Sequence, residues 1–569
     1  MNRILAQLQP SEIKNLSLSE REHLCEELRE KIISTVSSCG GHLSSNLGVV
    51  ELTVGLFTVF NFPDDKIVWD VGHQCYAYKL LSGRYERFHT LRKKDGISGF
   101  PKRQESVFDS YNTGHAGNSV SAAIGLKKAC ELTGNPANVI AVIGDGSFNN
   151  GLIYEALNCL PILNSKILIV LNDNNMSISP TVGATHELLS KSQEDNQKNI
   201  ALIEQYGVQY MGNVNGNDLE EVTSALQEAK EKLQTSSVLL HIKTKKGAGY
   251  GFCEENPMQT HGVAPENAKQ EQEYSKLLGE KMIELAQKDS SVVAVTAAMT
   301  DALGLREFFN RFPERSFDVG ICEENAAVLC AGMAGGGLKP YYAIYSTFLQ
   351  RAFDEIIHDI CAQDLPVTFC IDRGGLSGSD GETHQGVFDL SYLSLIPNMT
   401  VAVPKDGEEL KQMLELSLNY PHPLAIRYPR SAKHYFASQT KPEVGTFEYL
   451  TQKTNSPVTL LACGERAIAM AFSVRERTNI PFDIVNARYV KPLDSALLSA
   501  ITSKHIVTLE DNASIGGLGS QINKFYQNSG KTVQNYAYAD TFIPQGGIEE
   551  LQREYGLNER EIADYILSL

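Results

Sequence analysis

The sequence predicts an α/β protein of three domains, each built on a mostly parallel sheet flanked by helices. At 569 residues the chain is too long for a single hydrophobic core, so several domains are expected. Short apolar runs typical of buried strands alternate with helical patterns along its whole length. Within residues 139–171 a strand, a helix and a second strand follow in order, which places the two strands parallel in one sheet.

Composition narrows the classes of function. Apolar residues make up 42% of the chain and charged residues 21%, as in soluble globular proteins. The net charge of −17 argues against nucleic acid or an anionic membrane as a partner. The 11 cysteines form no CxxC pair and the amino terminus has no signal-like apolar core, which favours free thiols in a reducing cytoplasm. No apolar run reaches the 18 residues that a membrane span needs.

The first predicted domain covers residues 1–265 and carries the most informative pattern. Its strand 139–143 ends at a Gly-Asp-Gly turn that contains Asp145, and the strand 167–171 ends just before Asn174. Open α/β sheets bind ligands beyond the carboxyl ends of such strands. Carboxylate and amide oxygens suit Mg²⁺, which also accepts phosphate oxygens and needs few protein ligands. The pattern therefore predicts a diphosphate held through a metal; the alternative is a glycine-rich turn with a capping aspartate.

The remaining elements of this domain are expected in a regular order. They are a helix from about 16 to 32, a Gly-His pair at 41–42, a strand 67–69 followed by Gly-His at 72–73, a loop 111–117 opening a helix 119–130, and a strand 238–242 followed by a glycine-rich turn to Tyr250. Residues 251–275 are polar and broken by Pro and Gly, so we interpret them as a linker.

Two further α/β domains are predicted after this linker. The second covers 276–440, with strands at 292–296, 341–344, 367–371 and 401–403. The third covers 450–569, with strands at 458–461, 482–485 and 506–509. Because the third domain carries few candidate catalytic residues, we interpret it as an interface or stability domain.

Several longer motifs resemble a known family. The Gly-Asp-Gly turn followed by Asn174 is similar to the thiamine-diphosphate signature, and the resemblance to the 1-deoxy-D-xylulose-5-phosphate synthase family runs nearly end to end. The stretches that carry it are GGHLSSNLGVVELTVGL, WDVGHQCYAYKLLSGR, LNDNNMSIS, TKKGAGY, FDVGICEENA, AIYSTFLQRAFD, THQGVFDLSYL, RYPRSA, ARYVKPLD and TFIPQGGIEEL. It implies a transketolase-like fold.

The resemblance also implies cofactors and site residues. The cofactors are thiamine diphosphate and Mg²⁺, with the metal on Asp145, Asn174 and Met176. The implied cofactor-binding positions are His73, Gly114, His115, Ala116, Asp145, Gly146, Ser147, Asn174, Tyr250, Glu323 and Phe348. The implied catalytic positions are Glu323, His42 and His384, and the substrate positions are Tyr345, Arg351, Arg373, Asp380 and Arg430. His261 matches a family histidine near the active site.

Glu323 has a specific chemical task in this scheme. A carboxyl group in a dry pocket must protonate the ring nitrogen of the cofactor's aminopyrimidine. An acidic helix start is the alternative explanation of this residue. The chain departs from the family at Glu324-Asn325, where a second carboxylate close to Glu323 would raise its pKa. A second departure, at 116–118, removes a hydroxyl, so any bond to the cofactor at Ala116 must come from the backbone.

The implied reaction joins pyruvate and D-glyceraldehyde 3-phosphate to give 1-deoxy-D-xylulose 5-phosphate and carbon dioxide, for isoprenoid precursor, thiamine and pyridoxal synthesis. The resemblance also implies a cytoplasmic homodimer, without nucleic acid or membrane. Two alternatives stay open. One is transketolase-type ketol transfer, which the YSTFLQRAFD and FIPQGG stretches disfavour. The other is a cofactor-binding paralogue without turnover, which the departures keep open.

Overall fold

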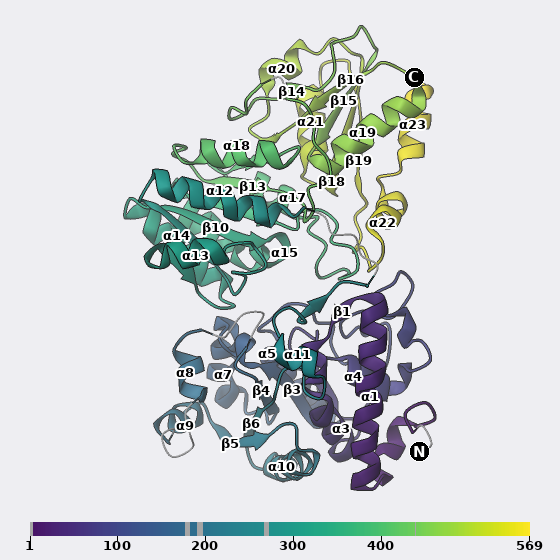
Figure 1. Cartoon of the computed structure of the whole chain (residues 1–569), viewed down its shortest axis with the longest axis vertical. Helices are drawn as coiled ribbons and strands as arrows, with labels where there is room; N and C mark the ends of the chain where they lie inside the picture. Colours follow the sequence, from purple (N-terminus) through teal and green to yellow (C-terminus); the bar gives the residue numbers. More distant parts are fainter. Residues whose placement is uncertain (1–3, 177–181, 191–196, 267–271, 439) are drawn as a thin grey trace. The chain divides into compact units, whose positions relative to one another are not determined.

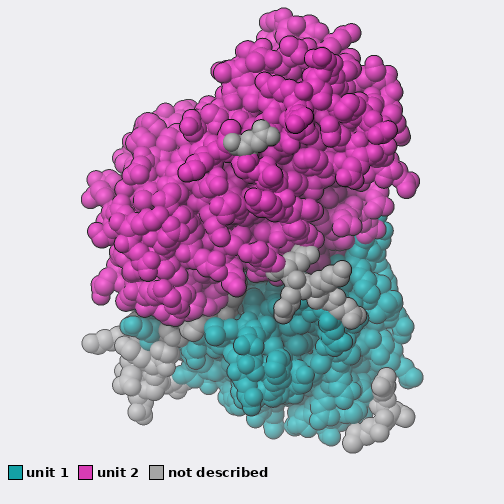
Figure 2. Space-filling view, turned by 45° about the horizontal axis from the view of Figure 1, so that its top comes forward, with its two compact units in different colours: residues 1–268, 320–322 teal, residues 269–319, 323–569 magenta. Residues whose placement is uncertain are grey.

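The structure is a computed structural model that describes residues 4–176, 182–190, 197–266, 272–438 and 440–569. The chain divides into two compact units, coloured separately in Figure 2. Unit 1 comprises residues 1–268 and 320–322, and unit 2 comprises 269–319 and 323–569. Within the described residues the strands form four sheets, of two, five, seven and five strands. No described helix has both the length and the apolarity to cross a membrane.

Unit 1 is built on a five-stranded parallel sheet (Figure 1). In sheet order its strands are β2 (Lys66–Trp69), β3 (Val139–Gly144), β4 (Leu168–Asp173), β6 (Ser237–Lys243) and β5 (Val208–Asn215). Alternate residues of β3 enter different cores: Ile140 and Val142 join one apolar cluster, and Ala141 and Ile143 join another. Both faces of the sheet are therefore covered, as a parallel sheet requires.

The helices of unit 1 divide between these two faces. Residues of α1, α3 and α10 belong to the cluster with Ile140, and residues of α5 and α7 belong to the cluster with Ile143. The helices are α1 (Leu18–Cys39), α2 (Ser44–Leu47), α3 (Val50–Val59), α4 (Tyr76–Lys79), α5 (Ser119–Leu132), α6 (Asp145–Phe148), α7 (Gly151–Leu163), α8 (Ala184–Ser190), α9 (Gln197–Glu204), α10 (Leu219–Lys232) and α11 (Gly251–Glu255), with short turns η1 (Pro10–Asn15), η2 (Leu80–Arg84) and η3 (Phe88–Thr90). The predicted β-α-β unit is thus confirmed as β3–α7–β4.

The segment predicted as a linker is partly structured. Residues 251–255 form α11, and β7 (Gly262–Val263) pairs antiparallel with β1 (Gly41–His42). Cys253 is buried in the unit 1 core, so apolar packing outweighs the polar composition around it. The linker interpretation is therefore wrong for 251–263. Residues 267–271, which the same prediction covers, lie outside the described part of the chain.

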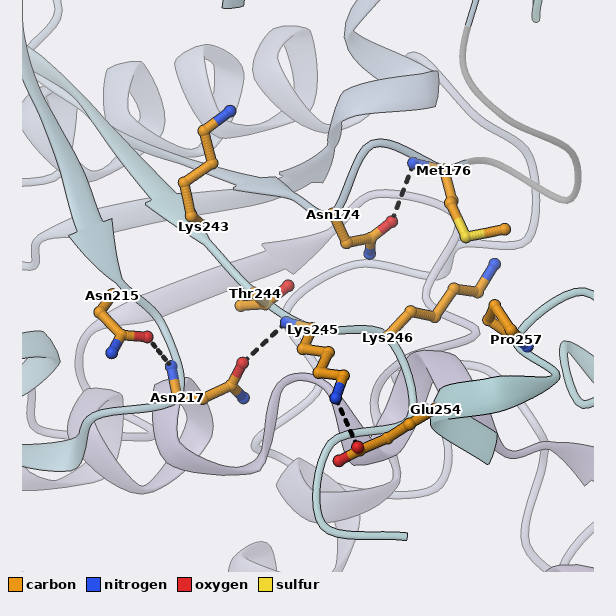
Figure 3. A pocket seen from close by; sticks show the side chains of 10 residues that line it. All are labelled: Asn174, Met176, Asn215, Asn217, Lys243, Thr244, Lys245, Lys246, Glu254 and Pro257. Carbon is orange, nitrogen blue, oxygen red and sulfur yellow. Dashed lines mark hydrogen bonds and ion pairs between the residues drawn. The ribbon is translucent and has the colours of Figure 1, made fainter. Parts of the chain in front are cut away.

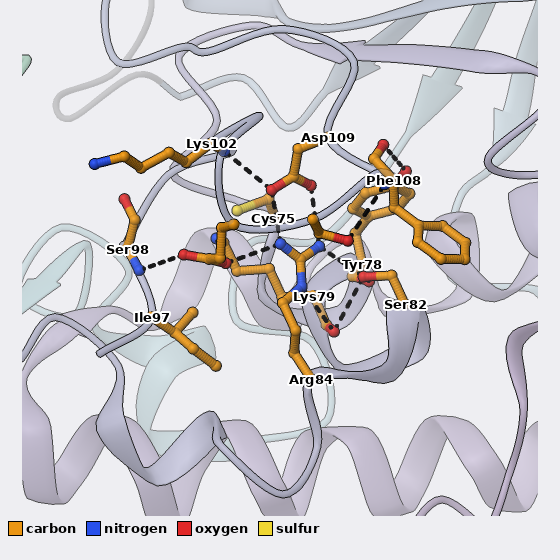
Figure 4. A network of polar contacts seen from close by, with 12 residues as sticks. Cys75, Tyr78, Lys79, Ser82, Arg84, Ile97, Ser98, Lys102, Phe108 and Asp109 are labelled. Atoms are coloured by element: carbon orange, nitrogen blue, oxygen red, sulfur yellow. Dashed lines mark hydrogen bonds and ion pairs between the residues drawn. The ribbon is translucent and has the colours of Figure 1, made fainter. Parts of the chain in front are cut away.

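A buried ionic network fixes the irregular stretch between β2 and α5 (Figure 4). The Arg84 guanidinium donates to both oxygens of Asp109, at 2.6 and 3.0 Å, and to Glu105 at 2.8 Å. Lys79 donates to the same Glu105 oxygen at 2.5 Å. All four side chains are buried, and the two cations balance the two carboxylates, so removing one partner would leave an uncompensated charge.

Unit 2 contains the two other large sheets. The seven-stranded sheet runs β17 (Tyr489–Lys491), β12 (Thr400–Ala402), β13 (Leu424–Arg427), β11 (Thr368–Asp372), β10 (Lys339–Tyr345), β8 (Val292–Thr296) and β9 (Ser316–Asp318), parallel except for β17. The five-stranded sheet runs β14 (Glu448–Tyr449), β16 (Asp483–Asn486), β15 (Val458–Cys463), β18 (His505–Ala513) and β19 (Thr532–Tyr538), parallel except for β14. Strand β17 lies within the third predicted domain in sequence, but it pairs with β12 of the second. The domain bounds 1–265, 276–440 and 450–569 stay a prediction.

The helices of unit 2 begin with α12, before the first strand, and continue between and after the strands (Figure 1). They are α12 (Tyr274–Lys288), α13 (Arg306–Arg311), α14 (Glu323–Gly335), α15 (Ser346–Leu349), α16 (Phe353–Glu355), α17 (Asp389–Ser394), α18 (Gly407–Ser417), α19 (Glu465–Thr478), α20 (Ser495–Ala500), α21 (Leu518–Tyr526), α22 (Ile548–Tyr555) and α23 (Glu559–Leu567), with short turns η4 (Pro313–Arg315), η5 (Gln350–Ala352) and η6 (Ile356–Cys361). The helix predicted to start at Glu323 is confirmed as α14.

Candidate functional site

The predicted metal ligands follow adjacent parallel strands of unit 1. Asp145 comes directly after β3 and opens α6, and Asn174 comes directly after β4. Asp145 is buried, and the Asn174 Oδ1 accepts the backbone N–H of Met176 at 3.1 Å, which folds the chain beyond β4 into a tight turn. Across the described residues no group of three or more His, Cys, Asp and Glu side chains is arranged to hold a metal. A site here has to be of the two-side-chain kind that Mg²⁺ accepts when phosphate completes its shell.

A cavity of about 370 Å³ opens beside Asn174 and Met176 (Figure 3). Three lysines that follow or end β6 line it: Lys243, Lys245 and Lys246. Lys243 is paired with Asp173, and Lys245 donates to Glu254 at 2.5 Å.

Lys246 differs from its two neighbours. It is only 5% exposed, and its side chain runs between Met176 and Pro257 in Figure 3. Burial lowers the pKa of Lys246 to about 8, and the negative charge of Asp145 opposes that shift. An ammonium group, a carboxylate and an amide oxygen thus meet at one end of the sheet. This is a donor set that suits a divalent metal with a diphosphate.

Asp70 organises the loop that the sequence predicted as a diphosphate contact. It follows β2, is buried, and accepts the backbone N–H groups of Gly117 and Ser119 at 2.9 and 3.0 Å. Burial raises the pKa of Asp70, and hydrogen bonds from Ser119, Gly117 and Ser147 oppose the rise. One carboxylate therefore ties together β2, the 114–119 turn and the α6 turn that carries Asp145 and Ser147.

Two glycines shape this loop. Gly117 has a φ of 86°, and a Cβ there would lie 2.5 Å from the side-chain oxygen of Asn150, so a hydroxyl-bearing residue does not fit at this position. Gly72 has a φ of 84°, and a Cβ there would lie 2.3 Å from the hydroxyl of Thr113. The turn before His73 is thereby packed against the loop that contains Gly114, His115 and the buried Ala116. At the departure from the family pattern at 116–118, the Asn150 side chain thus occupies the space that a side chain at position 117 would need.

Three histidines form a triangle in the same unit. The rings of His42, His73 and His261 have centroids 5.3 Å apart in each of the three pairs. The buried Asn46 donates to the backbone carbonyls of both His42 and His73 at 2.8 Å, which fixes the two segments relative to each other.

His261 connects this triangle electrostatically to Lys246, beside the predicted metal ligands. Its Nδ1 lies 3.2 Å from the hydroxyl of Ser45. Burial lowers the pKa of His261 well below its usual value, and the charges of Lys246, His42 and His73 act in the same direction. Lys246 therefore acts electrostatically on both His261 and Asp145.

Tyr250 is placed differently from the other predicted residues of unit 1. Tyr250 precedes α11 and is 37% exposed. Its one described ring contact is with Phe252, with the ring centroids 6.4 Å apart. Among the described contacts none joins the Tyr250 ring to the histidines or to Asp145. Its role stays a prediction.

In unit 2, Glu323 opens α14 and is only 4% exposed. Arg351 donates to the Glu323 carboxylate at 3.2 Å, and its Nε lies 3.9 Å from Glu324. Burial raises the pKa of Glu323, Arg351 opposes the rise, and Glu324 adds to it. The second carboxylate, that of Glu324, therefore raises the pKa of Glu323, as predicted. Arg351, which the resemblance placed with substrate, contacts the candidate acid.

A second cluster forms where strands β10 and β11 end, at the paired residues Tyr345 and Asp372. The Tyr345 ring stacks on Phe348, whose ring meets His384 edge-on, with centroid distances of 5.4 and 5.7 Å. Arg373 lies over the Tyr345 ring at 4.6 Å and donates to its hydroxyl at 2.9 Å.

Asp372 holds Arg373 in this position. The Arg373 backbone adopts a φ of 61°, unusual for a residue with a side chain, and its side chain donates to Asp372 at 2.9 Å. Burial raises the pKa of Asp372 to about 6, while Arg373 opposes the rise. Strained backbone of this kind persists where surrounding contacts enforce it, and it is concentrated at functional sites.

Arg430 belongs to the same neighbourhood but is exposed. Its side chain is 59% exposed, and its Nε donates to Glu273 at 2.8 Å. Burial raises the pKa of Tyr345 to about 12, and the charges of both Arg373 and Arg430 oppose the rise. Asp380 lies four residues before His384 in the loop that follows Arg373. The Arg373 side chain is therefore largely buried, whereas that of Arg430 is exposed.

Four residues of these clusters were not anticipated from the sequence: Asp70, Lys246, Glu273 and Asp372. Asp70 and Asp372 follow or end apolar strands, and Lys246 lies in the TKKGAGY stretch that comes directly after strand β6. The rule that identified Asp145 would have found these three. Glu273 has no such signal, because its partner Arg430 is 157 residues away in the chain.

Comparison with known proteins assigns the class and then the family. Residues 270–434 match the transketolase pyrimidine binding domain, and 448–562 match the transketolase C-terminal domain. The fold is thus the transketolase-like α/β fold. Residues 5–201 and 193–244 match the family described as 1-deoxy-D-xylulose-5-phosphate synthase.

The curated relatives agree over the whole chain. A 1-deoxy-D-xylulose-5-phosphate synthase of Clostridium tetani is 43% identical, covering 98% of both chains. One of Clostridium kluyveri is 42% identical, covering 98% of this chain and 97% of its own. The chain belongs to the 1-deoxy-D-xylulose-5-phosphate synthase family. A solved transketolase of Campylobacter jejuni aligns at 18% identity with a TM-score of 0.46 over 97% of this chain and 100% of its own; the assignment rests on the sequence relatives alone.

Proposed function

We propose that the chain condenses pyruvate with D-glyceraldehyde 3-phosphate to 1-deoxy-D-xylulose 5-phosphate and carbon dioxide. The carboxylate carbon of pyruvate leaves as carbon dioxide, the remaining two-carbon fragment forms a bond to the aldehyde carbon, and one proton is taken up. The observation that carries this proposal is the full-length likeness to curated enzymes named for that product.

The test is product formation with purified protein. Incubation with both substrates, thiamine diphosphate and Mg²⁺ is expected to yield 1-deoxy-D-xylulose 5-phosphate and one carbon dioxide for each molecule of product. Ketol transfer from a ketose phosphate, without carbon dioxide release, would instead indicate a transketolase. Cofactor binding without either reaction would indicate a paralogue that has lost turnover.

Thiamine diphosphate and Mg²⁺ are the cofactors that we propose for this site. The donor set of unit 1 fits them: Asp145 and Asn174 offer hard oxygens, Lys246 offers a buried cation, and a cavity lies beside them. Asp145, Asn174 and Met176 would hold the metal, and Lys246 would face the diphosphate. The bound cofactor supplies the electron sink for decarboxylation. The protein's residues orient it and exclude water.

Lys246 should contribute directly to diphosphate binding. Replacing it with methionine removes a charge-assisted hydrogen bond of about 1.5–3 kcal/mol, so we expect thiamine diphosphate to bind about 10- to 150-fold more weakly. Calorimetric titration in excess Mg²⁺ measures this change. Lys245→Met is the matched control because that neighbouring side chain is 62% exposed and paired with Glu254. The assignment is contradicted if the two variants lose the same affinity for thiamine diphosphate. It is also contradicted if Lys246→Met weakens the binding of thiamine, which lacks the diphosphate, as much as it weakens that of thiamine diphosphate.

Unit 2 would supply the acid and the acceptor pocket. Glu323, held by Arg351, would protonate the pyrimidine ring, and Phe348 would pack against that ring. His384 beside Phe348 and the histidines of unit 1 are the candidate proton-transfer groups. Tyr345 and Arg373 would receive the phosphate of the aldehyde, because a guanidinium group donates two parallel hydrogen bonds.

The two phosphate arginines should differ in importance. Arg373 packs on Tyr345 with 16% of its side chain exposed, so its truncation to alanine should weaken D-glyceraldehyde 3-phosphate binding by about 2–5 kcal/mol. This corresponds to a rise of about 30-fold to several-thousand-fold in KM. Arg430→Ala, at an exposed site, should raise KM about tenfold or less. Steady-state kinetics with phosphorylated and unphosphorylated D-glyceraldehyde measure both effects. The ranking is wrong if Arg430→Ala reduces the preference for the phosphorylated aldehyde more than Arg373→Ala does.

We further propose that the protein acts as a cytoplasmic homodimer and that its product feeds isoprenoid precursor, thiamine and pyridoxal synthesis. Family membership supports these assignments. All 11 cysteines are free thiols in the structure, in keeping with a reducing compartment.

A further inference from the structure

Glu273 is fixed opposite Arg430 by a short antiparallel contact between distant parts of unit 2. The backbone N–H of Tyr274 donates to the Arg430 carbonyl at 3.0 Å, and that of Ala432 donates to the Gln272 carbonyl at 2.8 Å. These bonds flank the bridge between Glu273 and Ser431. The Glu273 carboxylate accepts a hydrogen bond from the Arg430 Nε at 2.8 Å. The backbone that carries both residues is therefore held in place by these bonds.

The helix that begins after Glu273 does not account for this side chain. Glu273 precedes the first residue of α12, where a capping side chain would accept a helix N–H. Its side chain makes no capping hydrogen bond to the helix backbone. One carboxylate oxygen accepts from the Arg430 Nε at 2.8 Å, and the other accepts from the Ser275 hydroxyl at 3.5 Å. With 36% of the Glu273 side chain and 59% of the Arg430 side chain exposed, the pair contributes little to stability. Its effect has to be sought in what Arg430 does.

The charge of Glu273 also acts on the cluster at the ends of β10 and β11. It is among the charges that act on Tyr345, on Asp372 and on Arg373, in each case after burial and nearer partners. The cluster thus holds two guanidinium groups, each paired with a carboxylate: Arg373 with Asp372 and Arg430 with Glu273. A phosphate that approaches Arg430 competes for an Nε that already donates to a carboxylate.

We propose that Glu273 is a specificity-determining residue that weakens recognition of the acceptor's phosphate by occupying Arg430. The proposal rests on the proposed function and goes beyond it, because it concerns which aldehydes the enzyme favours. With Glu273 present, the advantage of a phosphorylated aldehyde over an unphosphorylated one is reduced. Glu273 does not touch reacting atoms, so its effect appears in KM for the acceptor and not in kcat.

The variant Glu273→Gln tests this proposal. Glutamine keeps the shape of the side chain and loses its charge, and no helix cap is lost. We expect KM for D-glyceraldehyde 3-phosphate to fall about threefold to tenfold, as for release of one charged donor from an ion pair at an exposed site. KM for D-glyceraldehyde and for pyruvate, and kcat with each acceptor, should stay as in the wild type. Glu280→Gln, which removes an exposed carboxylate elsewhere on α12, is the matched control and should change none of these values.

The double variant identifies Arg430 as the route of the effect. In an Arg430→Ala background, Glu273→Gln should change KM for the phosphorylated aldehyde by less than about twofold. The proposal is overturned if Glu273→Gln leaves the preference for the phosphorylated aldehyde unchanged, or if Glu280→Gln shifts it equally. Thermal unfolding of each variant, followed by circular dichroism, shows that the comparison is made between folded proteins. Absence of product from the wild type would instead refute the proposed function, so the two failures are distinguishable.

Discussion

Replacing Glu323 with glutamine is expected to lower kcat by about 10²- to 10⁴-fold, the range typical of losing a positioned general acid. The carboxyl group is buried at the start of α14 and held by Arg351, and an amide in its place cannot protonate a ring nitrogen. Cofactor binding should persist, because the diphosphate and metal contacts belong to other residues. The measurement is exchange of the cofactor C2 proton in deuterated buffer, beside calorimetric titration of the cofactor.

Glu324→Gln is the companion variant. The negative charge of Glu324 is one cause of the raised pKa of Glu323, so its removal lowers that pKa. The protonated form of Glu323 is then lost at lower pH, and the alkaline limb of the kcat profile should move toward acid while the maximal rate is largely kept. Exchange at the wild-type rate in Glu323→Gln, together with its loss in Glu324→Gln, would transfer the role of activating acid to Glu324.

Asp145→Ala is expected to weaken thiamine diphosphate binding by at least about 100-fold, above the 10- to 100-fold typical of losing a residue that only supports a metal ligand. Asp145 directly follows β3 and is buried near Lys246, so its loss would leave the proposed metal site without a carboxylate ligand. The fold should persist, because β3 and its neighbours are held by apolar packing on both faces. Calorimetry in Mg²⁺ buffer measures the affinity, and chelation of Mg²⁺ in the wild type should reproduce the loss. Unchanged affinity would remove Asp145 from the metal site.

Much of the fold could be predicted because buried parallel strands leave a local signal. The apolar runs at 139–143 and 292–296 correspond to β3 and β8 within one residue at either end. Strands with mixed burial were missed, and β5 and β19 are examples: their exposed and half-buried positions interrupt the apolar run. The two-residue strands β1 and β7 also carry no local pattern, because each exists only through pairing with the other.

The site was predictable where a functional residue directly follows a strand. Asp145, Asn174 and Tyr345 follow or end strands, and the structure places them at strand ends as expected. Residues that act through partners far along the chain were not predictable. Glu273 is the example, because its partner Arg430 is 157 residues away in the chain. The substrate role that the resemblance implies for Arg430 stays a prediction, and the structure pairs its exposed side chain with Glu273.

The network of Arg84, Asp109, Glu105 and Lys79 has a consequence for hydrogen exchange. The backbone N–H of Ser98 donates to Glu105 at 2.7 Å, and that of Lys102 donates to Asp109 at 3.0 Å, in a described stretch without helix or strand. Exposing either amide to solvent requires an opening that separates buried opposite charges, at a cost of about 3–5 kcal/mol. Such irregular backbone should therefore exchange its protons at rates typical of core strands, and the loop that leads to residues 111–117 would be among the slowest-opening parts of unit 1.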